Sequence, residues 1–382
     1  MKPFHIINLT QSSVAQLHRS FSTRLIAWQN KHGRHNLPWQ NTRDPYKIWL
    51  SEIMLQQTQV SRAVLFYTRF LKYYPDVNTL AGATLDEIMS LWSGLGYYSR
   101  AHNLYCCAQI VLKEHKGIFP TTTKALSKLP GIGRSTAAAI ASFAYGARSA
   151  ILDGNVKRVL SRIFGIEGFP DEKHVENEMW MLSESLLPID TDYNSINAYT
   201  QGIMDLGAIL CVRRKPDCVN CPFTDDCIAK LTGRQLEFPA VRPKKTLPTR
   251  KIWMLLLFKK DMILLERRPS VGIWRGLWSL PEAETRLMLI KRVDQLGGSR
   301  RLMSLMPIMC KFTHFRLEIE LRLSKADNIN SSYDEYKKED SNIHEMETKW
   351  VHLNSIDRYG MPTPVRKLLD TAASILRTEV YP

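Results

Sequence analysis

The first part of the chain has apolar residues at helical spacing. In residues 46–60, 84–92 and 101–112 they recur three and four positions apart, which lines one face of a helix. Glycine and proline separate these segments from one another. Because no strand-like alternation interrupts the pattern, residues 1–232 are predicted to be all helical.

The pattern changes after this helical part. Residues 233–251 contain three prolines and six basic residues with little apolar content, which predicts an extended linker. In residues 252–266 a polar turn separates two apolar runs, as in a β-hairpin. Residues 312–323 alternate like a strand, residues 364–377 have helical spacing, and the polar residues 324–348 are predicted to form a long loop. The C-terminal part is therefore expected to be α+β.

Length and composition limit the class of protein. The chain has 382 residues, of which 44% are hydrophobic and 23% charged, which indicates a globular protein of two or three domains. The longest apolar run, residues 252–258, is far shorter than the ~20 residues of a membrane-spanning helix. The first residues have no signal-peptide apolar core. We therefore expect a cytoplasmic protein without a membrane partner.

The chain is strongly basic. Its formal net charge is +15, and both the helical part and the remainder carry an excess of Lys and Arg. Such a charge favours a polyanionic partner, most commonly nucleic acid, although a merely basic surface would give the same composition.

Four of the seven cysteines lie within 17 residues, in the spacing C-x6-C-x2-C-x5-C. They are Cys211, Cys218, Cys221 and Cys227. Four thiolates on one short segment suit a zinc ion or an iron–sulfur cluster, and the spacing leaves both open. Three cations within the first loop could contact phosphate or be solvated; they are Arg213, Arg214 and Lys215.

A second motif is LSKLPGIGRSTAAAI, residues 126–140. Gly131 and Gly133 are expected to form a tight turn with positive φ angles. An alanine-rich helix then begins near Arg134 and ends at Gly146. Free backbone N–H groups at such a turn bind phosphate without reading sequence, as in a helix-hairpin-helix, although the turn could also be a plain connector.

Two carboxylates are candidates for chemistry. Asp153 precedes a predicted helix, where an aspartate commonly serves only as the N-cap. Glu52 lies in the predicted helix 46–60, which is largely apolar and also contains Gln56. A solvated Glu52 would be unremarkable. If it is buried in a pocket, however, its pKa rises and it can donate a proton at neutral pH.

Together, the motifs resemble the helix-hairpin-helix DNA glycosylases that carry a [4Fe–4S] cluster, and in particular the MutY-type adenine DNA glycosylases. The matching segments are LPWQ (37–40), WLSEIMLQQTQV (49–60), LWSGLGYYSRAHNL (91–104), LPGIGRST (129–136), LDGNVKRVLSR (152–162), MDLGA (204–208) and the cysteine loop. The resemblance covers nearly the whole chain and is weakest in residues 282–348.

This resemblance implies a multidomain fold: an all-α helix-hairpin-helix glycosylase core with a [4Fe–4S] cluster domain, and a C-terminal α+β Nudix-like domain. The expected divisions are a cluster domain (1–35 and 150–232), a six-helix barrel (36–149, with the hairpin at about 121–146), a linker (233–251) and the Nudix-like domain (252–382). The four cysteines would hold one cluster, and no nucleotide cofactor is expected.

The resemblance also implies a reaction, the hydrolysis of the N-glycosidic bond of adenine mispaired with 8-oxoguanine or guanine in DNA. The product is an abasic site in base excision repair. Glu52 matches the general acid, and Asp153 the carboxylate that stabilises or traps the oxocarbenium ion, with Asn155 orienting it. Ser135 stands where lyase relatives have a lysine, and a hydroxyl cannot form an imine. The enzyme is therefore expected to be monofunctional and to act as a monomer on double-stranded DNA.

Further residues match positions that recognise DNA. Gln56 and Gln57 match residues that fill or read the space left by the flipped adenine, and Tyr97 matches a wedge beside 8-oxoguanine. The hairpin residues Gly131, Gly133 and Arg134 match phosphate contacts. Phe312, Thr313 and His314 match an F-S-H loop that approaches 8-oxoguanine, with Thr in place of Ser.

Three alternatives stay open. One is a bifunctional glycosylase and lyase of the endonuclease III type, which Ser135 disfavours. A second is a DNA-binding cluster protein without activity, which the presence of both Glu52 and Asp153 disfavours. The third is a Nudix pyrophosphohydrolase, which is disfavoured because residues 270–300 lack the glutamate run that binds magnesium.

Overall fold

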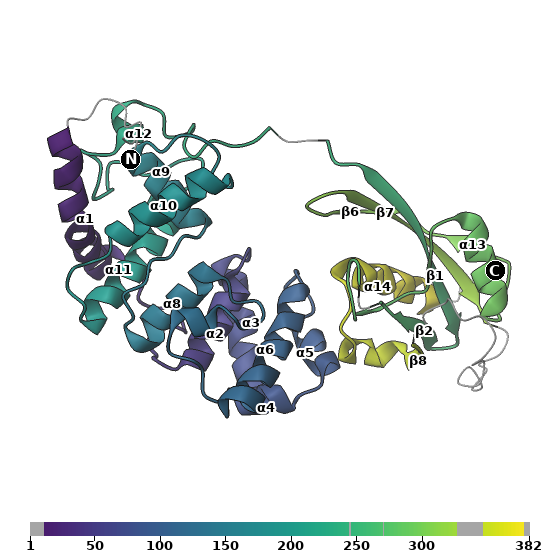
Figure 1. The fold of residues 1–382 in the computed structure, drawn as a ribbon. Helices are drawn as coiled ribbons and strands as arrows, with labels where there is room; N and C mark the ends of the chain where they lie inside the picture. The colour runs from purple at the N-terminus through teal and green to yellow at the C-terminus, as the bar shows by residue number, and fades with distance from the viewer. Residues whose placement is uncertain (1–10, 244–245, 270, 327–346, 378–382) are drawn as a thin grey trace. The chain divides into compact units, whose positions relative to one another are not determined.

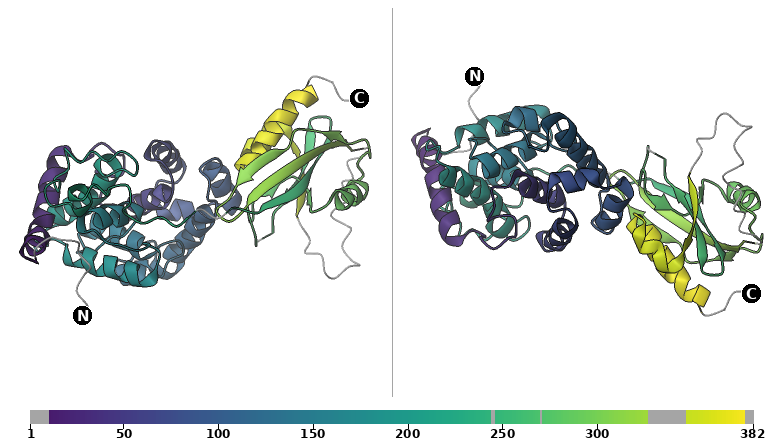
Figure 2. Two further views of the ribbon diagram at one scale, coloured as in Figure 1. Left: turned by 90° about the horizontal axis from the view of Figure 1, so that it is seen from above. Right: turned by 90° about the horizontal axis from the view of Figure 1, so that it is seen from below.

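The computed structural model describes residues 11–243, 246–269, 271–326 and 347–377. The chain divides into two compact units, one built from residues 1–81 and 106–244 and the other from residues 82–105 and 245–382 (Figures 1 and 2). The expected four-part division into cluster domain, barrel, linker and Nudix-like domain stays a prediction. None of the described helices combines the length and apolar character needed to cross a bilayer.

All helical elements up to α12 come before the first strand, and the remaining helices lie among or after the strands. The helical elements are α1 (Gln11–His32), α2 (Pro45–Leu55), α3 (Val60–Tyr73), α4 (Val77–Gly82), α5 (Leu85–Trp92), α6 (Ser99–His115), α7 (Thr123–Leu126), α8 (Arg134–Tyr145), α9 (Gly154–Phe164), α10 (Lys173–Ser185), α11 (Tyr193–Asp205), the π-helical turn η1 (Leu206–Leu210), α12 (Ile228–Leu231), α13 (Arg286–Gln295), the 3-10 helix η3 (Leu353–Arg358) and α14 (Thr363–Arg377). The strands are β1 (Thr249–Lys259), β2 (Met262–Arg267), β3 (Trp278–Ser279), β4 (Glu282–Ala283), β5 (Met303–Ser304), β6 (Ile308–Lys311), β7 (Arg316–Lys325) and β8 (Thr348–His352).

In the first unit, the core forms where α1 packs against α9, α10 and α11. Phe21 of α1 is fully buried, and its ring stacks on that of Phe223 with the centroids 4.5 Å apart. The buried face of α9 includes Val156, Val159 and Ile163, which follow the spacing of one helical stripe. Helix α9 is thus fixed in place by its apolar side, and its first residues are left to line a site.

The helix expected over residues 46–60 ends early, at Leu55. The reason is the backbone of the two glutamines, since Gln56 leaves the helical region (φ −55°, ψ 109°) and Gln57 has a φ of +56°. A new helix, α3, begins at Val60. Gln56 therefore does not share the helix of Glu52 as predicted. The helices predicted over 84–92 and 101–112 are confirmed as α5 and α6.

In the second unit, one sheet of eight strands separates two helices (Figure 1). The strand order is β3-β2-β1-β7-β5, with β4 paired to β1, β6 to β7 and β8 to β2. Strands β1 and β7 are parallel, and the other strand pairs are antiparallel. Alternate residues of β1 pack against α14 on one face and against α13 on the other. The α+β prediction for this part is confirmed, as is the helix predicted near the end of the chain.

The predicted hairpin over residues 252–266 is confirmed, with Phe258 opposite Ile263 in β1 and β2. The strand predicted from residue 312 begins four residues late, at Arg316. Phe312 donates its backbone N–H to the carbonyl of Phe315 (2.9 Å) and so closes the turn from β6. The predicted loop over residues 324–348 lies for the most part outside the described residues.

The predicted linker is only partly extended. Phe238 is buried in the core of the first unit, and its carbonyl accepts a hydrogen bond from Nε of Arg162 (3.0 Å). The guanidinium of Arg234 lies over the ring of Phe238. An apolar ring within a basic, proline-rich segment thus fixes the first part of the linker, and the last residues join β1, which begins at Thr249.

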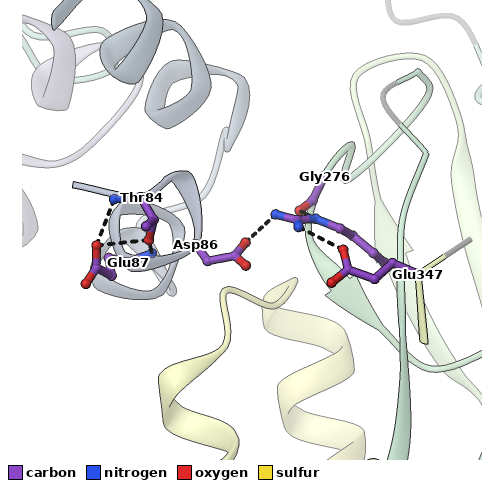
Figure 3. A network of polar contacts seen from close by, with 6 residues as sticks. Thr84, Asp86, Glu87, Gly276 and Glu347 are labelled. Atoms are coloured by element: carbon purple, nitrogen blue, oxygen red, sulfur yellow. Dashed lines mark hydrogen bonds and ion pairs between the residues drawn. The ribbon is translucent and has the colours of Figure 1, made fainter. Parts of the chain in front are cut away.

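The segment 82–105 belongs to the same compact unit as the strands, although it lies among helices in the sequence. At the start of α5, Asp86 is paired with Arg267 of β2, which also contacts Glu347 and the carbonyl of Gly276 (Figure 3). The sequence pattern had no means of indicating this long-range association.

Candidate active site and cysteine-lined pocket

A pocket of about 950 Å³ in the first unit is lined by all four predicted catalytic residues. Residues from the end of α1, the loop before α2, and from α2, α8, α9 and α11 line it. The predicted catalytic set on its wall is Glu52, Ser135, Asp153 and Asn155, and Gln56 and Gln57 line it as well. Segments separated by a hundred residues therefore meet at one site.

Asp153 is held at the start of α9 as its N-cap. One carboxylate oxygen, Oδ1, accepts hydrogen bonds from the backbone N–H groups of Asn155 (3.0 Å) and Val156 (2.8 Å). Burial raises the pKa of Asp153, whereas these two donors and the positive charge of Arg158 act in the opposite direction. The capping geometry fixes the carboxylate at the pocket wall.

Glu52 lies in the last turns of α2, half-buried among the pocket residues. Burial raises its pKa to about 8, and the negative charge of Asp153 contributes to the same shift. At neutral pH Glu52 is therefore mostly protonated. The two carboxyl groups sit in different environments. Backbone donors and a nearby guanidinium favour the charged form of Asp153, whereas burial and the charge of Asp153 favour the protonated form of Glu52. Such a difference allows one carboxyl group to act as an acid while the other acts as a carboxylate.

Ser135 lies in the first turn of α8 beside the predicted hairpin. Its hydroxyl oxygen accepts a hydrogen bond from the backbone N–H of Leu152 (3.0 Å). Gly131 has the expected positive φ of 79°. The same expectation is wrong for Gly133, which has φ −81° and ψ 174° because the N-cap of α8 takes an extended backbone. Gly146 caps the C-terminus with φ 68°, as predicted.

Arg158 is a site residue that the sequence analysis missed. Its Nη2 donates to the side-chain oxygen of Asn155 (2.9 Å) and to the carbonyl of Gly207 (2.7 Å), and its Nε donates to the carbonyl of Cys211 (2.8 Å). Asn155 contacts Asp153 through its backbone N–H, and its side-chain oxygen binds Arg158. The signal was available, since residues three apart on a helix lie on the same face.

Gly207 packs closely against Asn155. A Cβ at Gly207 would lie 2.7 Å from that of Asn155, whereas a Cβ at Gly154, the first residue of α9, would meet nothing within 4 Å. We expect Gly207→Ala to lower the free energy of unfolding by about 1–3 kcal/mol through overpacking. The matched substitution Gly154→Ala should be neutral or stabilising, because alanine is the better helix residue. Thermal unfolding measures both, and an unchanged Gly207→Ala protein would contradict this account.

The four predicted ligand cysteines line a second, smaller pocket together with Arg162 and Leu206. None of the four is in a disulfide bond, and burial raises the pKa of Cys221 to about 12 and that of Cys227 to about 11. The nearly buried Arg162 donates to the carbonyls of Val212 (2.7 Å) and Arg213 (2.9 Å). Among the described residues, no three His, Cys, Asp or Glu side chains are placed to share a single metal ion.

The predicted DNA-contacting cations differ in their surroundings. Arg213, Arg214 and Lys215 are exposed in the cysteine loop. The guanidinium of Arg134, in contrast, lies 3.8 Å from the ring centroid of Trp180 and pairs with Glu184. All four side chains are exposed, but the guanidinium of Arg134 is already engaged by neighbouring side chains.

The predicted recognition residues lie in both units. In the first, Nε2 of Gln56 lies 3.4 Å from both the hydroxyl of Thr136 and the carbonyl of Gly131, and Gln57 is exposed. In the second, Tyr97 is 53% exposed. Thr313 and His314 form the exposed tip of the turn between β6 and β7, where the rings of Phe312 and Phe315 stack 4.7 Å apart.

Comparison with known proteins shows the family of this chain. A family model described as "HhH-GPD superfamily base excision DNA repair protein" matches residues 50–185, and one described as "NUDIX domain" matches residues 252–371. The adenine DNA glycosylase of Buchnera aphidicola subsp. Acyrthosiphon pisum is 36% identical over 354 residues, which cover 92% of this chain and 97% of that protein. This chain belongs to the adenine DNA glycosylases. The resemblance found in the motifs and the predicted fold class are both confirmed.

More distant members of the family match as well. The adenine DNA glycosylase of Mus musculus is 30% identical over 394 residues, which cover 87% of this chain and 75% of that protein. Among solved structures, a thermostable thymine-DNA glycosylase has a TM-score of 0.52 and 29% identity, and the match covers 58% of this chain and 99% of that one. This similarity relates the adenine DNA glycosylase chain to a glycosylase named for a different base.

Proposed function

We propose that this chain hydrolyses the N-glycosidic bond of adenine paired with 8-oxoguanine, or with guanine, in double-stranded DNA and leaves an abasic site for base excision repair. The observation that carries the proposal is the pairing of Glu52 and Asp153 in one pocket, where the pKa of Glu52 is raised to about 8. Membership of the adenine DNA glycosylases supports the choice of base.

The two carboxyl groups have complementary tasks in this reaction. Adenine leaves poorly as an anion, so Glu52 donates its proton to a ring nitrogen as the bond between that base and C1′ breaks. Asp153 stabilises the positive charge that develops on the deoxyribose, or traps it as an adduct, in the manner of retaining glycosidases. Water then adds at C1′ and supplies the proton that restores Glu52. Before this, adenine must leave the base stack, because the reacting bond is inaccessible in the duplex.

Ser135 supports a monofunctional enzyme. Its hydroxyl oxygen already accepts the N–H of Leu152, and an alcohol cannot form the imine that lyase chemistry needs. Cleavage of the strand should therefore require alkali. The rival is a glycosylase and lyase of the endonuclease III type, which would nick the strand unaided.

Several residues of this chain are proposed to contact DNA. The backbone around Gly131 and Gly133 and the exposed cations Arg213, Arg214 and Lys215 would contact phosphates. Gln57, with Gln56 beside it, would fill the space that the flipped adenine leaves. Tyr97 and the tip residues Thr313 and His314 are proposed to contact 8-oxoguanine, and Arg134 would contribute through the hairpin backbone rather than through its occupied guanidinium.

The four cysteines are proposed to hold one [4Fe–4S] cluster. The set of four thiols around one pocket fits such a group, because iron–sulfur clusters are bound by four cysteine thiolates. When bound, the cluster would tie the loop with the exposed cations to the rest of the first unit. Arg162 holds the same loop through the carbonyls of Val212 and Arg213.

We expect Cys221→Ser to lose iron and acid-labile sulfide together, with a lower unfolding temperature, because metal binding is coupled to folding. Cys310→Ser, which changes a cysteine outside the pocket, should keep both. Elemental analysis and thermal unfolding of the purified proteins make the comparison. Zinc in place of iron in the wild-type protein would refute the cluster assignment.

A single-turnover assay tests the proposed reaction. Labelled duplexes carry adenine opposite 8-oxoguanine, adenine opposite guanine, adenine opposite thymine, or thymine glycol, each assayed with and without alkali. Cleavage of the adenine strand after alkali, fastest opposite 8-oxoguanine, is the expected result. Nicking at thymine glycol without alkali would instead establish the lyase alternative.

A further inference from the structure

The loop between α5 and α6, residues 93–98, has a strained backbone. Gly94 and Gly96 have φ angles of 96° and 80°, and Tyr97 follows with a φ of 48°. A tyrosine rarely adopts this left-handed conformation, so the surrounding structure must hold it there. Tyr97 is also half-exposed, and its ring is therefore presented by the loop.

Hydrogen bonds from neighbouring residues fix one side of the loop. The indole Nε1 of Trp92 and Nη2 of Arg100 both donate to the carbonyl of Gly96, each at 3.1 Å. The guanidinium of Arg100 also lies 5.5 Å from the ring centroid of Tyr97. These contacts come from the segment itself.

The other side of the loop is attached to the C-terminal part of the same unit. The buried Tyr98 donates its hydroxyl proton to the carbonyl of Met361 (2.8 Å), and the same hydroxyl oxygen accepts the N–H of Gly94 (3.3 Å). The hydroxyl of Ser93 also donates to the carbonyl of Met361 (3.3 Å). One backbone carbonyl therefore holds both ends of the strained loop.

That carbonyl belongs to a residue in the buried core of the second unit. Met361 is fully buried in the core between the sheet and α14, and the adjoining carbonyl of Gly360 accepts the N–H of Trp278 (2.9 Å). Gly360 also packs directly on α5, since a Cβ there would lie 2.5 Å from Cβ and 2.8 Å from the carbonyl carbon of Met89. The arrangement leaves no space between the segment and the sheet domain at this point.

We propose that Tyr98 is a positioning residue through which the C-terminal domain fixes Tyr97, so that the preference for 8-oxoguanine over guanine opposite adenine depends on the Tyr98 hydroxyl. This inference rests on the proposed function, because it concerns how that site selects its mispair. Tyr98 itself contacts no base. It acts through the conformation of the loop.

The test is a cycle of four proteins: wild type, Tyr98→Phe, Tyr97→Ala and the double variant. Single-turnover rates on adenine opposite 8-oxoguanine and opposite guanine give a preference ratio for each protein. Tyr98→Phe removes only the hydroxyl and with it the hydrogen bonds to Met361 and Gly94, and it should lower this ratio about fivefold. In the Tyr97→Ala background the same change should have less than about a twofold effect, because Tyr97 is no longer there to be positioned.

Two further variants distinguish the positioning of Tyr97 from a general loss of contact between this segment and the C-terminal part. Ser90→Ala removes another hydrogen bond to the C-terminal part, from the hydroxyl of Ser90 to the carbonyl of Asp357 (2.8 Å), but lies outside the loop. It should leave the ratio unchanged. Gly360→Ala keeps the Tyr98 hydroxyl but disturbs the packing of residue 360 against Met89. It should therefore also lower the preference ratio.

The outcomes distinguish the two levels of the proposal. If wild-type protein shows no preference for 8-oxoguanine, the proposed function fails in that part and this inference fails with it. If the wild type has the preference and Tyr98→Phe keeps it, or if the effects of Tyr98→Phe and Tyr97→Ala multiply independently, the inference alone is overturned. The inference is supported if Tyr98→Phe lowers the ratio, if this effect is lost in the Tyr97→Ala background, and if Gly360→Ala lowers the ratio as well.

Discussion

Glu52→Gln should reduce the single-turnover rate of adenine release by about 10²–10⁴-fold, the usual contribution of a general acid. Glutamine keeps the shape of the side chain and its place in α2 but has no acidic proton to transfer. Because the loss lies in the chemical step, binding of the mispaired duplex should change little. A matched exposed substitution on α6, Glu114→Gln, should have no effect on the rate.

The pH dependence provides a second measurement on the same residue. Glu52 must carry a proton to act, and its pKa is raised to about 8 by burial and by Asp153. The wild-type rate should therefore hold near neutral pH and fall as the pH rises through about 8. The residual rate of Glu52→Gln should lack this alkaline limb. If the rate of Glu52→Gln falls at alkaline pH in the same way as the wild-type rate, the proton must come from another group.

Glu52→Gln should lower the activity of the protein without lowering its stability. The pKa of Glu52 is higher in the folded protein than in the unfolded chain, because the folded state disfavours the charged form. The folded protein therefore loses stability as the pH rises above the pKa of the unfolded chain. Glutamine carries no such charge. Glu52→Gln is thus expected to unfold at the same or a higher temperature than the wild type above neutral pH, which would exclude misfolding as the cause of its inactivity.

Local sequence signals predicted much of the site. Asp153 was expected before a helix and is its N-cap, and Gly146 ends α8 as expected, because capping depends on residues within a few positions. The failures are also local in origin. Gln57 was misjudged because helical periodicity does not report which residue leaves the helical region of φ and ψ. Gly133 was misjudged because glycine adopts positive and negative φ angles with similar ease, so its presence in a turn does not set the sign.

Properties that depend on distant segments were beyond the sequence. The raised pKa of Glu52 comes from burial by several helices and, to a lesser extent, from the charge of Asp153, which is far away in the chain. Phe238 looked like part of a linker until Arg162 supplied its partner. The packing of segment 82–105 with the sheet domain likewise depends on contacts such as Met89 with Gly360, which no pattern within either segment encodes.

Arg158 and Arg162 show how one helix serves two sites. Both lie on α9, one turn apart, and both donate to backbone carbonyls of the cysteine loop. Arg158 in addition binds the side chain of Asn155, next to Asp153. Arg158 therefore links the start of α9 to the cysteine loop, and Arg162 adds further hydrogen bonds to that loop.

Asp153→Asn should reduce adenine release by about 10²–10³-fold or more, since the substitution removes a charge aimed at the developing cation. Asparagine retains an Oδ1 that can accept the N–H groups of Asn155 and Val156, so the N-cap of α9 and the fold should persist. Single-turnover kinetics and thermal unfolding of the same preparation separate these two effects.

Asp192 provides the matched control, because it caps α11 in the same way and accepts the N–H groups of Asn194 and Ser195. Asp192→Asn should leave the rate unchanged. The corresponding alanine variants extend the comparison: Asp153→Ala and Asp192→Ala should each lose about 1 kcal/mol of stability with the cap, but only Asp153→Ala should lose activity. Equal activity losses in both would mean that Asp153 contributes as a helix cap and not through its charge.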